Sequence, residues 1–299
     1  MSNYILSCCS TADLTENQFK ENDLHYVSFT FELDGKQYVD DLGHSIPFDE
    51  FYKKVGAGAN VKTSQVNVEQ FEKYFEEFLK DGKDILHLCL SSGISGVINS
   101  AYTAKENLSV KYPDRKILIV DSLAASTGYG LFMIELSKKK KEGMSIDELY
   151  NWAEENKLKV NHWFFSTDLS CYIRGGRISK TAGMVGSLLS ICLLLNVNSE
   201  GKLIPREKIR GKKNAIEEIL TKMKENAKDG LDYTGKCMIS YSACLEDAEE
   251  LANKIEATFK KLDGKVIINS IGTVIGCHTG PGTVALFFLG KERELSINV

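Results

Sequence analysis

The sequence predicts an α/β fold in two domains, a Rossmann-like parallel sheet with helices on both faces over residues 1–158 and a mixed α+β domain over residues 159–299. In the first half, short β-rich runs alternate with amphipathic segments, which is typical of a parallel sheet covered on both faces. In the second half, strands surround only two predicted helices. With 299 residues, 43% of them hydrophobic, the chain is long enough to build two cores.

Periodicity and turn residues predict the elements of the first half. The clearest is a helix over Val68–Lys80, where apolar residues recur at helical spacing up to Asp81-Gly82. Asp34-Gly35 stands between two β-rich runs and predicts a hairpin. The predicted strands are residues 4–6, 25–33, 37–39, 84–90 and 116–120, and the predicted helices are residues 48–55, 68–80, 96–108, 127–141 and 145–156.

The second half is predicted by the same signals. Ser199-Glu200-Gly201-Lys202 is a hairpin-type turn that follows the apolar stretch Met184–Val197. Asn214–Asn226 has the apolar spacing of an amphipathic helix. The predicted strands are residues 160–165, 203–204, 237–241, 266–269 and 283–289, and the predicted helices are residues 214–226 and 245–259.

Composition excludes several classes of function. Lys and Arg number 37 against 41 Asp and Glu, so a generally basic nucleic-acid binder is not expected. No apolar run is long enough to span a membrane and no signal peptide is evident, which favours a soluble cytoplasmic protein. The eight cysteines form no CxxC pair and have no histidine cluster beside them, so we expect reduced, buried thiols and no metal site.

The strongest candidate site is the serine-rich loop Leu90-Ser91-Ser92-Gly93-Ile94-Ser95-Gly96, between a predicted strand and a predicted helix. Ligands bind at this edge of open α/β sheets, and helix N-termini with serine hydroxyls offer donors to a carboxylate or phosphate. The loop is neither GxGxxG nor a P-loop, and it misses the GxSxG elbow by one position. The alternative is a simple N-cap.

Four weaker candidates each have a structural alternative. Thr63-Ser64-Gln65 could bind a ligand or cap the helix that starts at Val68. His278 lies within the glycine-rich segment 272–282 and could contact a ligand or make a structural hydrogen bond. Two basic segments, 174–180 and 209–213, could receive an anion or the acidic face of a partner, or could be solvated loops.

Six short motifs resemble those of the DegV family and follow one another in that family's order. Each motif alone is weak, whereas the ordered set is specific and spans nearly the whole chain. The motifs are Ser10-Thr11-Ala12-Asp13-Leu14, Thr63-Ser64-Gln65, Leu90-Ser91-Ser92-Gly93-Ile94-Ser95-Gly96, Asp121-Ser122, Gly175-Gly176-Arg177-Ile178-Ser179-Lys180 and His278-Thr279-Gly280-Pro281-Gly282.

The resemblance implies a non-enzymatic protein that holds a long-chain fatty acid, such as palmitate, in a tunnel between its two domains, with no cofactor. Matched by motif, the carboxylate is expected to meet Thr63, Ser95, Ser92 and His278. The remaining residues of the expected ligand site are their neighbours Ser64, Ser91 and Thr279.

The resemblance also implies a protein partner. Some members of the family present the fatty acid to a separate ATP-dependent fatty-acid kinase, and the segment with Arg210 and Lys213 resembles their docking surface. We expect a monomer. The chain departs from the family pattern in two places, with Cys8-Cys9-Ser10 in place of Thr-Asp-Ser and Ile191-Cys192-Leu193 in place of Ile-Lys-Pro.

The residues themselves are compatible with this function and with two others. A fatty-acid tail of roughly 14 methylenes contributes on the order of 11 kcal/mol before the costs of binding. A serine hydrolase or acyltransferase could use Ser95 or Ser92 as nucleophile with His278 as base, although no third triad member is evident. A phosphorylated small molecule could bind at the same serine loop.

Overall fold

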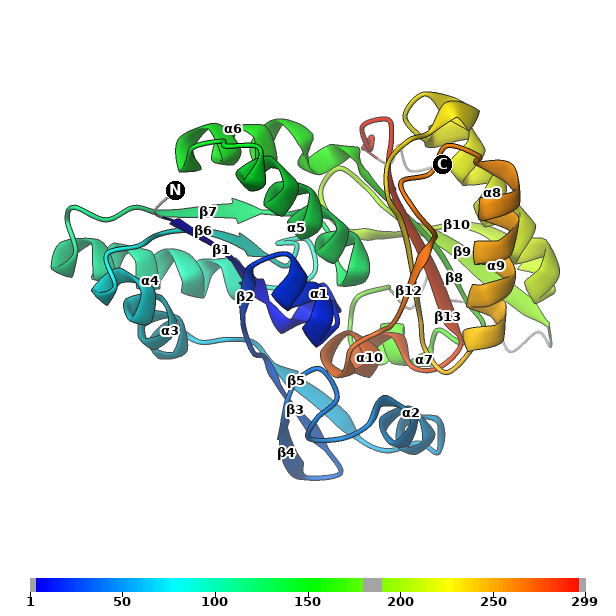
Figure 1. The fold of residues 1–299 in the computed structure, drawn as a ribbon. Helices are drawn as coiled ribbons and strands as arrows, with labels where there is room; N and C mark the ends of the chain where they lie inside the picture. The colour runs from blue at the N-terminus through cyan, green and yellow to red at the C-terminus, as the bar shows by residue number, and fades with distance from the viewer. Residues whose placement is uncertain (1–3, 180–189, 296–299) are drawn as a thin grey trace.

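The computed structural model describes residues 4–179 and 190–295. These residues form three sheets, with strand orders β2-β1-β6-β7, β10-β9-β8-β13-β11-β12 and β4-β3-β5 (Figure 1). The predicted apolar stretch 184–197 lies in part outside the described residues, as does Lys180. None of the described helices is both long and apolar enough to span a membrane.

The four-stranded sheet is parallel throughout, as predicted. Its strands are β1 (Tyr4–Cys9), β2 (Leu24–Val27), β6 (Asp84–Cys89) and β7 (Ile117–Asp121). One face is covered by α3 (Val68–Lys80) and α4 (Val97–Lys111), and the other by α5 (Ser126–Lys141) and α6 (Ile146–Asn156) (Figure 1). The predicted bounds of α3 are confirmed: Asn67 and Gln70 form its capping box, and its apolar face is buried.

The six-stranded sheet is mixed. Its strands are β8 (Val160–Ser166), β9 (Ile191–Val197), β10 (Leu203–Arg210), β11 (Cys237–Tyr241), β12 (Ile267–Ser270) and β13 (Thr283–Leu289). β11 and β12 run parallel, and the other neighbouring strands run antiparallel. The outer face is covered by α8 (Lys212–Asn226) and α9 (Leu245–Thr258) (Figure 1). The predicted turn before Leu203 is confirmed, because it joins β9 to β10.

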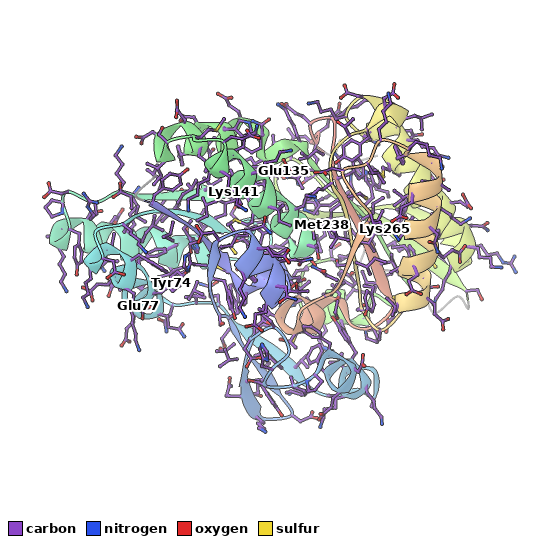
Figure 2. The ribbon with its side chains drawn as sticks, viewed as in Figure 1. Tyr74, Glu77, Glu135, Lys141, Met238 and Lys265 are labelled. Atoms are coloured by element: carbon purple, nitrogen blue, oxygen red, sulfur yellow. The ribbon has the colours of Figure 1, made fainter. Side chains whose placement is uncertain are left out.

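Helix α5 lies between the two large sheets and is buried on almost every side. Figure 2 labels Glu135 on this helix and Met238 on β11, whose side chain belongs to the same core as Leu131 and Phe132 of α5. Gly128 permits the close approach, since a methyl group there would overlap the rings of Phe287 and His162. One core therefore joins both halves of the chain.

The three-stranded sheet projects from the rest of the molecule (Figure 1). It contains β3 (Thr30–Leu33), β4 (Lys36–Val39) and β5 (Val61–Ser64), with α2 (Phe48–Gly56) and α10 (Thr273–Thr279) beside it. The short elements that complete the fold are α1 (Glu16–Glu21), α7 (Ser170–Arg174) and the 3-10 helices η1 (Ser10–Ala12), η2 (Lys157–Lys159) and η3 (Gly230–Asp232).

Two expectations of local structure are wrong. The single strand predicted over residues 25–33 is two strands in different sheets, because the chain turns away after Val27 and the Phe29 N–H donates to Ser10 Oγ. Thr63 and Ser64 end a strand, and Asn67 caps the helix that follows. In addition, the glycine-rich segment 272–282, for which the sequence predicts no element, contains the helix α10.

The strands of the four-stranded and three-stranded sheets all precede residue 122, and those of the six-stranded sheet all follow residue 159. Helix α10, from the second half, nevertheless packs on α2, β3 and β5 of the first. A domain boundary near residue 158 stays a prediction. All eight cysteines are free and all but Cys244 are buried, as the sequence predicts.

Candidate ligand-binding site

A cavity of about 210 Å³ lies where the parallel sheet, the projecting sheet and the inner face of the six-stranded sheet meet. This volume is far larger than the roughly 10–15 Å³ that one buried water needs. Most of its wall is apolar, and the apolar lining consists of Phe29, Leu90, Ile94, Ala125, Phe164, Val197, Leu203, Ile271, Val274, Ile275, Ala285 and Phe287.

One part of the wall carries a hydrogen-bonded threonine–histidine pair. Thr63 Oγ1 lies 2.9 Å from His278 Nε2, although 215 positions separate the two residues. Burial, and then the charge of Arg177, lower the pKa of His278 to about 4, so its ring is neutral at pH 7. Any side chain at position 175 would collide with the His278 ring, which explains the glycine there.

Two helix N-termini reach the cavity beside this pair. Ser95 and Gly96 line it at the start of α4, and Ala125 and Ser126 line it at the start of α5. Ser95 Oγ accepts a hydrogen bond of 3.3 Å from the Val97 N–H, which leaves its own proton available to a ligand. Because both helices follow strands of the parallel sheet, this is the ligand-binding edge that the sequence predicts.

Four of the seven predicted ligand residues line the cavity, namely Thr63, Ser95, His278 and Thr279. The other three do not. Ser64 is exposed, because alternate residues of a strand face opposite sides. Ser91 is buried and donates to the Gly201 carbonyl at 2.8 Å, so it joins the serine loop to the β9–β10 turn. Ser92 is exposed, and its N–H donates to Asp121.

Arg177 also lines the cavity and is absent from the predicted ligand site. Burial lowers the pKa of its guanidinium, which donates to the Gly175 carbonyl. The signal in the sequence is the basic turn Gly175-Gly176-Arg177, which fits an anion site and a solvated loop equally well. The structure therefore adds a positive charge to a site that the sequence predicts to be built from hydroxyls and one histidine.

The geometry gives no support to a serine hydrolase. Among the described residues, no hydrogen bond joins His278 to Ser92 or Ser95, and His278 Nδ1 has no partner. A general base works best with a pKa near the operating pH, and that of His278 is about 4. A Ser–His pair does exist between Ser7 and His87, at 2.8 Å, but both side chains are completely buried.

Within residues 4–179 and 190–295, no group of three or more His, Cys, Asp and Glu side chains is arranged to hold a metal. The second histidine on the cavity wall, His162, is structural. Its Nε2 accepts from the Ala125 N–H at 3.3 Å, and its Nδ1 therefore carries the proton and donates to the Val160 carbonyl at 2.9 Å.

A family model described as "Uncharacterised protein, DegV family" matches residues 9–291. A DegV domain-containing protein of Clostridium perfringens is 40% identical over 98% of this chain and 100% of its own length. The chain belongs to the DegV family. The predicted family membership and fold class are confirmed.

Solved DegV structures extend this similarity. A DegV lipid-binding protein from Thermotoga maritima is 28% identical, with a TM-score of 0.83 over 98% of this chain and 100% of the other. A fatty-acid-binding DegV family protein from Thermus thermophilus is 27% identical, with a TM-score of 0.85 over 97% of this chain and 100% of the other. Both share the complete DegV fold with this chain.

The buried neutral His278 predicts an acid-dependent loss of stability. Its folded-state pKa of about 4 lies below the ordinary histidine value of about 6.5, so between these pH values the unfolded chain binds more protons. The free energy of unfolding is thus expected to fall as pH drops through this window, by at most about 1.4 kcal/mol per pH unit from this residue. Urea unfolding of the wild type and of His278→Gln at pH 6.5, 5.5 and 4.5 measures this change in the free energy of unfolding. Equal pH slopes for the two proteins would contradict the prediction.

Proposed function

We propose that this DegV protein binds a long-chain fatty acid, such as palmitate, with its tail in the apolar cavity and its carboxylate at Thr63, Ser95 and His278. The observation that carries the proposal is the Thr63–His278 pair, which lies with Ser95 on the wall of a mostly apolar cavity. The fatty-acid-binding relative from Thermus thermophilus, with the same fold, supports it.

The physical requirement is that a buried carboxylate finds donors. The Ser95 hydroxyl, the Thr63–His278 pair and the two helix N-termini supply donors, and the helix ends add positive potential. Arg177 supplies the opposite charge at the cavity wall. The apolar wall then contributes about 0.8 kcal/mol for each methylene it buries.

Mass spectrometry of lipids extracted from protein purified without added lipid tests the proposal. We expect a long-chain fatty acid in a one-to-one ratio with the protein. An empty extract, together with no binding of added fatty acids, would contradict it. Displacement of the ligand by phosphate esters but not by aliphatic acids would favour the phosphorylated small molecule instead.

Two serines of one loop provide a matched test of the head-group site. Ser95→Ala is expected to weaken fatty-acid binding about 10-fold, the effect of one hydrogen bond to a charged group in a desolvated site. Ser92→Ala removes the same hydroxyl outside the cavity and is expected to leave affinity unchanged. Titration with a fluorescent fatty acid measures both. Equal losses in the two variants would place the carboxylate elsewhere.

We further propose that the protein presents its fatty acid to a fatty-acid kinase through Arg210 and Lys213, and so acts as a carrier and not as the catalyst. Arg210 ends β10 and Lys213 lies in the first turn of α8, and both side chains are exposed. No ion pair joins either residue to another residue of the described ranges. Leu203, at the other end of β10, lines the cavity. A kinase bound at Arg210 would therefore have to reach roughly 23 Å along this strand to the cavity.

Charge reversal tests the docking surface. Arg210→Glu is expected to reduce acyl-phosphate formation by the kinase while fatty-acid binding stays at the wild-type level, because the residue lies outside the cavity. Lys265→Glu makes the same change of charge at an exposed site, labelled in Figure 2, and serves as control. Equal delivery by the wild type and both variants would remove this surface from the proposal.

A further inference from the structure

A second cavity, of about 150 Å³, shares no lining residue with the first. It lies where the chain leaving η1, the segment after β4 and the start of α10 come together. Most of its lining residues are polar, namely Ser10, Asp13, Thr15, Glu16, Asp40, His44, Asn269 and Ser270, and Gly272 completes that part of the wall.

Two carboxyl groups of this wall are almost completely buried, with Asp13 5% and Asp40 2% exposed. Each has one oxygen held by a hydroxyl, since Ser126 donates to Asp13 Oδ2 at 2.5 Å and Thr273 donates to Asp40 Oδ1 at 2.6 Å. The other two oxygens, Asp13 Oδ1 and Asp40 Oδ2, accept no direct hydrogen bond from a described residue, although the Gly272 N–H stabilises the Asp13 carboxylate and the Ser10 hydroxyl and Val274 N–H stabilise that of Asp40. Buried oxygens of this kind require a partner.

Both carboxyls lie beside Gly272. A methyl group on Gly272 would collide with Asp13 Oδ1 and would stand 3.8 Å from Asp40 Oδ1. Burial raises the pKa of the Asp13 carboxyl well above its usual value; the Ser126 hydroxyl opposes this rise and repulsion from Asp40 adds to it. The two groups therefore lie within electrostatic reach of each other.

The wall of this cavity carries no lysine or arginine to balance the pair. Its third carboxylate, that of Glu16, lies 2.6 Å from Lys20 and 3.6 Å from the His44 ring, and all three side chains are more than half exposed. The two buried carboxyls thus face a polar space whose lining contains no lysine or arginine to serve as a counter-charge. Ionisation of both carboxyls without a cation is costly in a desolvated site, which agrees with the raised pKa of each.

We propose that this second cavity binds one hard divalent cation of the Mg²⁺ type, held by Asp13 Oδ1 and Asp40 Oδ2 and by water. Mg²⁺ prefers oxygen ligands, uses one or two carboxylates and keeps several of its waters, and each water occupies about 30 Å³ of the liquid. Two carboxylates facing a cavity of about 150 Å³ meet this requirement without a third acidic, histidine or cysteine ligand. Zinc, which favours sulfur and nitrogen, finds neither among the buried groups that face this space.

The proposal differs from the expectation that the chain lacks a metal site. That expectation rests on short spacing motifs, and 27 positions separate Asp13 from Asp40. The two residues meet only because the projecting sheet folds back onto the end of β1, where the Asp40 N–H donates to the Phe29 carbonyl and the Phe29 N–H donates to Ser10.

Mn²⁺, which resembles Mg²⁺ and can be counted by electron paramagnetic resonance, is the probe. The full chain, stripped of metal with a chelator, is titrated with Mn²⁺ up to about 1 mM, the weak limit for oxygen-ligated cation sites. We expect one bound Mn²⁺ per chain, released by excess Mg²⁺ and not by K⁺. Absence of bound Mn²⁺ would overturn the proposal and leave water, with a proton shared by the two carboxyls, as the content of the cavity.

Variants then assign the site. Asp40→Asn is expected to weaken Mn²⁺ binding about 10-fold or more, whereas Asp114→Asn makes the same change of charge at an exposed residue outside this cavity and is expected to have no effect. Equal affinity in wild type and Asp40→Asn would also overturn the proposal. If circular dichroism shows that Asp40→Asn is unfolded, Asp13→Asn takes its place, and the wild-type count stands as a test in either case.

Discussion

An Ala285→Phe substitution is expected to weaken binding of a long-chain fatty acid about 100-fold. Ala285 lies on β13 between Ser240 and Phe164 of the neighbouring strands, and all three side chains line the cavity. A phenyl ring would take the space of about four methylenes, each worth about 0.8 kcal/mol when buried. Fatty acids too short to reach this part of the cavity are expected to bind as they do to wild type.

Displacement of a fluorescent fatty acid by acids of 8 and 16 carbons measures this effect. Leu286→Phe is the matched control, because Leu286 lies on the other face of the same strand, in the core under α8 and α9. Equal weakening for both chain lengths would indicate a general disturbance of the protein. Unchanged affinity for the 16-carbon acid would mean that the tail does not pass Ala285.

Gly128→Ala is expected to lower the free energy of unfolding by about 1 kcal/mol. The added methyl group would overlap the rings of Phe287 and His162, which are buried between α5 and the six-stranded sheet and cannot move aside freely. Overpacking of this kind costs about 1–3 kcal/mol, which exceeds the helical preference of alanine over glycine, at most about 1 kcal/mol.

Gly56→Ala provides the comparison for this substitution. Gly56 is also a helical glycine, in α2. A methyl group there would meet only a side-chain carbon of Pro281, at an ordinary van der Waals distance of 3.6 Å. The change is expected to leave stability unchanged or to raise it by up to about 1 kcal/mol. Urea unfolding followed by circular dichroism measures both variants, and a Gly128→Ala protein as stable as wild type would disprove the close packing of α5.

The parts of the fold that follow from local signals could be predicted from the sequence. Helix α3 is bounded by a capping box and by Asp81, and its apolar residues keep one spacing throughout, so local signals determine both its bounds and its buried face. The break between β2 and β3 has no such signal. It depends on a hydrogen bond from Phe29 to Ser10, 19 positions away, which no local pattern records.

In the candidate site, too, local signals predict some residues and miss a long-range contact. Ser95 was found because its loop joins a strand to a helix, a recognisable ligand-binding position. The mutual contact of Thr63 and His278 could not be predicted from the residues, since the two lie on β5 and α10 and meet only when the projecting sheet packs on α10. The resemblance to the DegV family named these residues but also included Ser64, which strand alternation turns away from the cavity.

The position of α5 has a consequence for how this chain can be divided. The helix contributes to a single core with β1 and β6 on one side and β8, β11 and β13 on the other. A fragment ending near residue 158 would leave an apolar face of α5 in water, and the complementary fragment would expose the inner face of its sheet. The two halves are therefore interdependent in folding, and heat should melt them in one cooperative calorimetric transition.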